Sequence, residues 1–361
     1  MNHFQDKRQI YNDNNRVYCG IDLVKLICAM LVVLLHTIEG NNSWYSNEIK
    51  YVFTSFAVPF FFLVSGFMFC RGVQRAENPY NYFLRYERKL LKIYFIWAVV
   101  IYLPFELNTY LNKYNGSSIF RIALLLLRRY ILIGPGPYWY IWALLLSIVF
   151  IYYCIVNNKD RLLLIMVLMG LLVEIMYTGF RHVLSGNMLF DLLFNTMYYV
   201  FSGERNFILY GIPFVGIGCM IYKYEIQFNK RLMLLCFIVA SILAALEYYA
   251  PIHNDSFGEI RVSFAFIIQA ICFFMYSLKM NIEIDYKESI SIRQLSSTIF
   301  YSHFIFLFEV VNPCILKYTI LPYYADWMII IKMLITLIMC YSFYFIIKSI
   351  NKKKLNVLIN G

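Results

Sequence analysis

The chain has 361 residues, of which 61% are hydrophobic and 19% aromatic, and its formal net charge is +11 at pH 7. Soluble domains contain roughly 45–50% apolar residues, so this composition excludes a water-soluble fold. Polar blocks long enough to form a second domain are missing, and we predict a single membrane domain over residues 20–348. Residues 1–19 are expected to form a cytoplasmic N-terminal segment, and residues 349–361 a cytoplasmic basic tail.

Apolar segments recur along the chain at lengths that cross about 30 Å of hydrocarbon as helices. We therefore predict an all-α, polytopic integral membrane protein with about ten transmembrane helices. The predicted spans are residues 20–38, 51–70, 90–107, 138–156, 162–177, 207–222, 232–249, 262–278, 295–311 and 328–347. Two further apolar segments, residues 118–132 and 188–201, contain charged residues and are expected to be interfacial or re-entrant helices.

Lysine and arginine residues gather in alternate loops between these spans, and the inner loops include Arg71, Lys89 and Arg293. With the N-terminus inside, cytoplasmic Lys and Arg outnumber the others by about two to one. We predict that both termini are cytoplasmic and that the chain is a multi-pass protein of the inner or plasma membrane. The positive net charge then reflects membrane orientation, and no nucleic-acid partner is expected.

The nine cysteines show neither a CxxC motif nor pairing with histidines. Most of them lie inside apolar runs, as Cys28, Cys219, Cys272 and Cys340 do, where cysteine behaves as a small hydrophobic residue. We predict neither a disulfide framework nor a metal site.

Ionisable side chains inside a membrane span are costly and mark candidate functional sites. The first span contains Lys25 and His36, which are 11 residues apart and therefore share one helix face to within about 20°. His36 lies roughly 16 Å beyond Lys25 along the helix axis. Histidine suits a general base near neutral pH, and Glu39, one turn later, is placed to orient or polarise its ring.

Structural interpretations compete with these functional ones. Asp22 and Lys25 have the spacing of an ordinary ion pair at a helix end, in which case His36 bonds to a carbonyl of a neighbouring span. In the second inner loop, Arg85 and Arg88 suit either binding of phosphate groups or contacts with lipid headgroups. Composition leaves both choices open.

Polar and aromatic residues of later spans give further candidates. His303 is a second candidate functional histidine. Trp139 lies between two tyrosines after a Gly-Pro-Gly-Pro sequence, and it is interpreted first as an interfacial anchor and second as the wall of a sugar site. Ser65 and Gly66 are expected to form a helix packing point rather than a nucleophile, because no G-x-S-x-G motif surrounds them.

Together these residues resemble the acyltransferase 3 family of membrane O-acyltransferases. The resemblance rests on Ile21-Asp22-Leu-Val-Lys25 followed by ten residues and His36, on Pro59-Phe-Phe-Phe-Leu-Val-Ser65-Gly66, and on Arg85-x-x-Arg88. Three later blocks are also similar, namely Pro137-Tyr-Trp139-Tyr-Ile-Trp142, the block from Arg205 to Gly218, and the segment from Leu295 to His303. The resemblance extends from about residue 20 to about residue 347.

The resemblance implies transfer of an acyl group, usually acetyl, from cytoplasmic acyl-CoA to a hydroxyl of an extracytoplasmic glycan or lipid-linked saccharide. It implies that His36 is the essential histidine and that Lys25 is its basic partner toward the donor. Arg85 and Arg88 are then the cationic pair that binds the coenzyme.

The same resemblance places Trp139, Arg205 and His303 in blocks that we expect to contact substrate. Transfer from a thioester needs a base for the hydroxyl proton and a partner for the developing oxyanion. We expect His36 to be that base, and both direct transfer and an acyl-histidine intermediate remain open.

A non-enzymatic hypothesis stands beside the acyltransferase. In it the chain is a transporter or flippase of a lipid-linked sugar or a small anionic substrate, and His36 is a proton relay. The sequence contains no internal repeat of the kind found in many transporters, and its basic pair lies on the predicted donor side.

Overall fold

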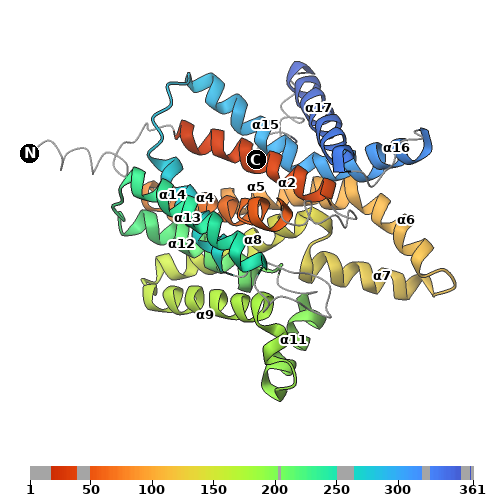
Figure 1. The fold of residues 1–361 in the computed structure, drawn as a ribbon, viewed down its shortest axis with the longest axis horizontal. Coiled ribbons are helices and arrows are strands. Elements are labelled where there is room, and N and C mark those ends of the chain that lie inside the picture. The colour runs from red at the N-terminus through yellow and green to blue at the C-terminus, as the bar shows by residue number, and fades with distance from the viewer. Residues whose placement is uncertain are drawn as a thin grey trace, which may run out of the picture.

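The computed structural model describes residues 18–38, 49–201, 205–249, 264–318, 326–350 and 358. Every regular element in these ranges is helical, which confirms the predicted all-α class (Figure 1). The α-helices are α2 (Cys19–Ile38), α4 (Ala57–Arg75), α5 (Pro79–Tyr94), α6 (Leu103–Lys113), α7 (Ile119–Arg128), α8 (Trp139–Val156), α9 (Asp160–Gly179), α10 (Arg181–Leu184), α11 (Met188–Phe201), α12 (Ile212–Lys223), α13 (Lys230–Tyr249), α14 (Ala265–Leu278), α15 (Tyr286–Ile305), α16 (Asn312–Tyr318) and α17 (Asp326–Ile350). Shorter helical segments are η1 (Ile49–Thr54), η2 (Phe95–Tyr102), η3 (Arg129–Ile133), η4 (Gly136–Tyr138), η5 (Phe207–Gly211) and η7 (Phe306–Val311).

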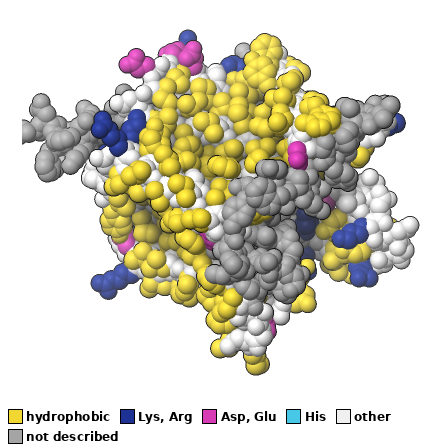
Figure 2. Space-filling view, viewed as in Figure 1, with side chains coloured by type: hydrophobic (Ala, Val, Ile, Leu, Met, Phe, Trp, Pro, Cys, Tyr) yellow, Lys and Arg dark blue, Asp and Glu magenta, His cyan; other side chains and the backbone are white. Residues whose placement is uncertain are grey.

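Eight helical stretches in the described ranges are long and apolar enough to cross a membrane. They are Cys19–Ile38, Val52–Arg75, Pro79–Lys113, Ile119–Val156, Asp160–Gly179, Lys230–Tyr248, Tyr286–Lys317 and Asp326–Ile350. The two other predicted spans fall on shorter apolar helices, Phe207–Lys223 and Ala265–Leu278. Hydrophobic side chains cover most of the visible described face, with charged residues toward its edges, as a surface in contact with lipid requires (Figure 2).

Several predicted regions lie mostly or partly outside the described residues. These are the N-terminal segment 1–19, the basic tail 349–361 and the first two residues of the predicted span 262–278. The cytoplasmic location of both termini stays a prediction.

Three helical stretches change their winding just before a proline. The π-helical segments η2, η5 and η7 end two residues before Pro104, Pro213 and Pro313, respectively. Proline lacks an N–H donor, and its ring clashes with the carbonyl four residues earlier. The wider π turns are therefore located where the regular hydrogen-bond ladder is interrupted.

Close packing of α4 on α12 is made by two glycines. A Cβ atom added at Gly66 would lie 2.0 Å from the Val215 carbonyl oxygen, and one at Gly218 would lie 2.1 Å from the Leu63 carbonyl oxygen. Side chains at either position would force the helices apart. Gly66 is thus a packing point, as the sequence predicts.

The helices α2 and α15 pack together and run in the same direction (Figure 1). At one end Asp22 bonds to Ser289 and Arg293, and at the other end the ring of His36 stacks on that of His303. These contacts fix how the two helices are aligned along their axes. The candidate functional residues of the first and ninth predicted spans are therefore neighbours.

The two extra apolar segments form helices, as expected. Residues 118–132 contain α7, which extends with α6 away from the centre of the molecule, and residues 188–201 contain α11 (Figure 1). The arginine that follows α7, Arg129, forms an ion pair with the buried Glu106 of α6. The interfacial or re-entrant position of these helices stays a prediction.

Candidate active site

A cavity of about 1160 Å³ lies between α2, α4, α5, α8 and α15. Small-molecule sites usually measure about 300–1,000 Å³, so this cavity has room for a ligand of coenzyme size. Five cations line it, and they come from four different helices: Lys25, Arg71, Arg85, Lys89 and Arg293. Among the described residues that line it, Asp22 carries the only carboxylate.

Asp22 is held in a network that uses both of its carboxylate oxygens. Arg293 donates from Nε to Oδ1 at 2.9 Å and from a terminal nitrogen to Oδ2 at 2.8 Å. Ser289 donates its hydroxyl to Oδ2 at 2.7 Å. The Asp22 side chain is 5% exposed, whereas that of Arg293 is 43% exposed. A two-pronged pair of this kind joins α2 to α15 and neutralises the carboxylate inside the cavity.

Lys25 lies one turn beyond Asp22 on α2, the spacing for which the sequence also suggested a simple helix-end pair. In the described part of the chain, the side-chain hydrogen bonds of Asp22 go to Arg293 and Ser289. Lys25 lines the cavity one turn further along α2. Its charge is available to a ligand there.

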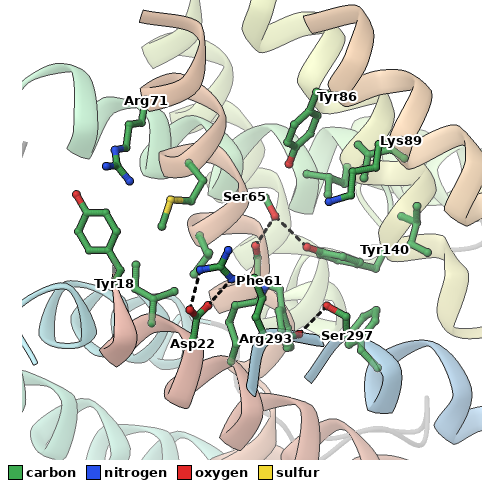
Figure 3. Close-up of a pocket in the computed structure, with 18 of the residues that line it drawn as sticks. Tyr18, Asp22, Phe61, Ser65, Arg71, Tyr86, Lys89, Tyr140, Arg293 and Ser297 are labelled. Carbon is green, nitrogen blue, oxygen red and sulfur yellow. Dashed lines mark hydrogen bonds and ion pairs between the residues drawn. The ribbon is translucent and has the colours of Figure 1, made fainter. Parts of the chain in front are cut away.

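The cations face the cavity from different sides (Figure 3). Arg71 approaches from α4, Lys89 from α5 and Arg293 from α15. The guanidinium of Arg71 lies 5.0 Å from the centre of the Tyr18 ring, a cation–π contact that holds it at this position. This end of the cavity is a basic surface suited to phosphate groups.

Another part of the cavity wall is formed by aromatic rings and a serine. Ser65 donates to the Phe61 carbonyl at 2.8 Å, and its hydroxyl lies 3.2 Å from that of Tyr140 (Figure 3). Phe300 and Tyr301 complete this part of the wall. Cations, aromatic rings and a few hydroxyls thus border the same cavity (Figure 3).

His36 lies beyond this aromatic part of the wall. Its ring stacks on His303 with centroids 5.3 Å apart and an angle of 28° between the planes. Phe304 and Phe308 contact it edge-on at 5.4 and 6.3 Å. Among the described residues, Lys25 lines the cavity and His36 does not. The prediction that both residues serve one ligand stays a prediction.

The protonation of His303 follows from its hydrogen bond. Its Nδ1 lies 2.9 Å from the Ile299 carbonyl oxygen, which can only accept. Nδ1 therefore carries a proton, and in the neutral ring Nε2 is the nitrogen with the lone pair. His303 is fully buried, so this bond fixes its orientation against His36.

The two predicted coenzyme arginines have different surroundings. Arg85 lines the large cavity, whereas Arg88 lines a smaller pocket of about 590 Å³ with Glu77, Asn78 and Asn81. Arg85 belongs to both. Of these two arginines, Arg85 lines the large cavity together with Lys25, and Arg88 does not.

The remaining predicted residues lie elsewhere. Trp139 packs against Phe62 and Tyr210, with ring centroids 6.1 and 5.8 Å away. Arg205 is exposed and directly precedes Asn206, which caps η5. Neither residue is among those that line the large cavity. Glu39 lies outside the described residues.

From the sequence, Arg71 and Arg293 are recognisable only as loop charges that set orientation, whereas Lys89 ends the basic cluster that begins at Arg85. The structure adds all three to the candidate site. Arg293 lies two residues before the predicted span 295–311, which places it among the inner-loop charges. Its partner Asp22 is 271 residues away, and no local pattern connects the two.

Comparison with known families decides what this site belongs to. The model of the acyltransferase domain family matches residues 19–345. The chain belongs to this family. The match contains every helix that lines the cavity, so the cavity and the histidine pair are parts of a membrane acyltransferase.

The acyltransferase is also similar to longer curated proteins from enterococci. A serine/alanine racemase of Enterococcus gallinarum is 24% identical over 273 residues, which cover 72% of this chain and 36% of that protein. Two amino-acid racemases of Enterococcus faecalis are 28% and 26% identical over 36% and 60% of the chain, respectively. The chain spans only 18–36% of the length of these relatives. No solved structure matches it.

Proposed function

We propose that this acyltransferase transfers an acyl group, in the first place acetyl, from acyl-CoA to a hydroxyl of an extracytoplasmic glycan or lipid-linked saccharide. The observation that carries the proposal is the cavity with five cations, whose lining helices α2 and α15 also bear the paired histidines. Acyl-CoA is a large polyanion with a thioester at the far end of a flexible arm. The cationic and aromatic parts of the cavity wall suit its two ends.

The donor's phosphates are assigned to the mouth of the cavity. Arg71, Arg85 and Lys89 line it, and each supplies charge-assisted hydrogen bonds to phosphate oxygens. Arg293 is occupied by Asp22, so it contributes mainly by cancelling that carboxylate. In this assignment Arg88 stabilises the donor from the neighbouring pocket or contacts a lipid headgroup.

The chemistry follows from the needs of acyl transfer. The acceptor oxygen attacks the thioester carbonyl, its proton passes to His36, and the carbon–sulfur bond breaks as the coenzyme thiol leaves with a proton. Lys25 stabilises negative charge on the donor side, and Glu39 orients the His36 ring. A positioned base of this kind contributes about 10²–10⁴-fold to the rate.

Contacts with the acceptor are assigned to the side of the molecule beyond the histidines. His303 supports this assignment through its stacking on His36. Trp139 and Arg205 remain candidates for binding the saccharide, because an indole ring suits a sugar face and a guanidinium suits an anionic group.

Transport is the second candidate function. Its support comes from the curated relatives, whose names describe enzymes that act on amino acids, together with the titratable His36 in a span. In this reading the basic cavity holds a small anionic substrate and His36 relays a proton across the membrane.

Purified protein in liposomes distinguishes the two functions. Radiolabelled acetyl-CoA is added with a membrane extract from the expressing cells as the acceptor source, and both released CoA and labelled glycan or lipid are measured. We expect wild type to transfer label and His36→Ala to lose about 10²–10⁴-fold of that rate. Thr37→Val is the matched control, since Thr37 is the buried neighbour that bonds to the Leu34 carbonyl of its own helix.

Two results would count against the enzyme. The first is wild type that neither binds nor turns over any acyl-CoA tested, and the second is full activity in His36→Ala. Uptake of labelled serine, alanine or saccharide into empty liposomes under a proton gradient would instead support transport.

A further inference from the structure

Phe300 lies between the cavity and His303. Phe300 of α15 is 5% exposed and lines the cavity. On the cavity side its ring packs against Phe61 and Tyr140, each with centroids 5.0 Å apart. On the other side it contacts His303 at 6.3 Å. The order from the mouth inward is therefore cavity, Phe300, His303 and His36.

The alignment of α2 with α15 supports this order. Asp22 is level with Ser289 and Arg293, and His36 is level with His303. Both helices thus progress from the basic mouth toward the imidazoles. Phe300 is three residues before His303, which corresponds to about 4.5 Å along the helix axis. Less than one helical turn lies between the cavity wall and the buried imidazole.

We propose that Phe300 is a specificity-determining residue that selects the acceptor hydroxyl over water. Its ring closes the aromatic part of the donor cavity wall and keeps the thioester apart from the imidazoles until an acceptor is in place. This inference rests on the proposed function, because the thioester and the base are the groups that the ring separates.

The physical reason is the difference in solvent on the two sides of the ring. The cavity is large and lined by charged side chains, so it admits water, whereas His303 is fully buried among Phe300, Phe304 and Ile299 and His36 is half-buried. Water that met both a thioester and an imidazole base would hydrolyse the donor. Exclusion of water from reactive groups is a known way to prevent this side reaction.

Acceptor binding must then displace the ring, because transfer needs the hydroxyl, the base and the thioester within reach of one another. Phe300 is anchored by contacts among rings rather than by hydrogen bonds. A rotation of its side chain therefore breaks no polar interaction. The hydroxyl attacks the thioester carbonyl, and the acyl group leaves sulfur for oxygen without water as a competitor.

The first test measures access to His303 and needs no enzymatic activity. Diethylpyrocarbonate, which modifies imidazole nitrogens, is added to the full-length protein in liposomes, and the His303 peptide is followed by mass spectrometry. Phe300→Ala should raise the modification rate about tenfold, and Phe300→Leu less. The matched control is Phe274→Ala, which removes a fully buried phenyl ring that packs on Phe60 and Phe67 and does not line the cavity.

The second test measures hydrolysis of acetyl-CoA without any acceptor. Phe300→Ala should release CoA about tenfold faster than wild type, and Phe300→Ala combined with His36→Ala should lose this gain. Unchanged modification of His303 overturns the proposal, and so does faster modification without faster hydrolysis. If wild type transfers no acyl group, the proposed function fails separately, and the modification rates still decide whether the ring is a barrier.

Discussion

Replacing Arg293 should destabilise the protein much more than replacing its partner Asp22. In Arg293→Gln the Asp22 carboxylate remains, and its side chain is 5% exposed. Breaking a buried pair in this way costs about 3–5 kcal/mol, because an uncompensated charge is left in a poorly solvated place. Ser289 still donates to Asp22, and Arg293 was itself 43% exposed. We therefore expect the lower end, about 3 kcal/mol.

The reciprocal change leaves the better solvated partner. In Asp22→Asn the guanidinium of Arg293 keeps its access to the cavity, and the amide oxygen still accepts one hydrogen bond. The expected loss is about 1 kcal/mol, the value of an ordinary hydrogen bond. Asp22→Asn combined with Arg293→Gln removes both charges, so it should be more stable than Arg293→Gln alone.

The measurement is unfolding of the purified protein in detergent, with all four members of the cycle compared under one condition. Lys223→Gln is the matched control, since Lys223 pairs with Asp160 at 2.5 Å with both side chains more than 20% exposed. That surface pair should contribute about 0–1 kcal/mol. Two results would refute the conclusion that the buried Asp22 carboxylate depends on Arg293. One is an equal loss of unfolding free energy in Asp22→Asn and Arg293→Gln. The other is a double variant that is no more stable than Arg293→Gln alone.

Three further outcomes follow from the cavity, the packing and the orientation. Arg85→Ala should raise the KM for acetyl-CoA about tenfold, which is the effect of losing one charge-assisted hydrogen bond. Arg88→Ala should raise the KM less, because Arg88 lines the smaller pocket and not the large cavity. Equal KM values for the two variants in steady-state kinetics would contradict this difference. Gly66→Ala should destabilise the protein by about 1–3 kcal/mol through overpacking against Val215, and an unchanged melting curve would speak against that contact. With the native cysteines replaced, Asn229→Cys should react with a membrane-impermeant maleimide only from the cytoplasmic side and Asn115→Cys only from outside; the reverse pattern would exclude the predicted orientation.

The helical architecture follows directly from the sequence because hydrocarbon permits few alternatives. A chain inside the bilayer must satisfy its backbone hydrogen bonds within each segment, so every apolar run of sufficient length becomes a helix. The predicted spans at 207–222 and 262–278 illustrate the limit. Their helices, Phe207–Lys223 and Ala265–Leu278, are shorter than the others, and residues 262–263 of the second span lie outside the described ranges.

The composition of the site was only partly predictable. Lys25 stands out in the sequence as a cation inside an apolar span, and Arg85 as the first residue of an Arg-x-x-Arg motif. Both residues line the cavity. Arg71 and Arg293 have no such pattern, since positive charge beside a span ordinarily sets orientation. Their role depends on which helices meet, and that is decided by contacts between residues far apart in the sequence, such as Gly66 with Val215.

The separation of the cavity from the imidazoles has its origin in the register of two helices. Asp22 and His36 are 14 residues apart on α2, and Ser289 and His303 are 14 residues apart on α15. Equal spacing on parallel helices brings both pairs into contact at once, about 21 Å apart along the axis. A shift of either helix by one residue rotates its side chains by about 100° and breaks both contacts together. The Asp22–Arg293 ion pair therefore helps to align His36 with His303, although it lies about 21 Å away from them along the helix axis. A buried ion pair seldom makes a protein more stable than well-packed hydrophobic residues at the same positions would. We therefore infer that this pair matters more for the alignment of the two helices than for stability.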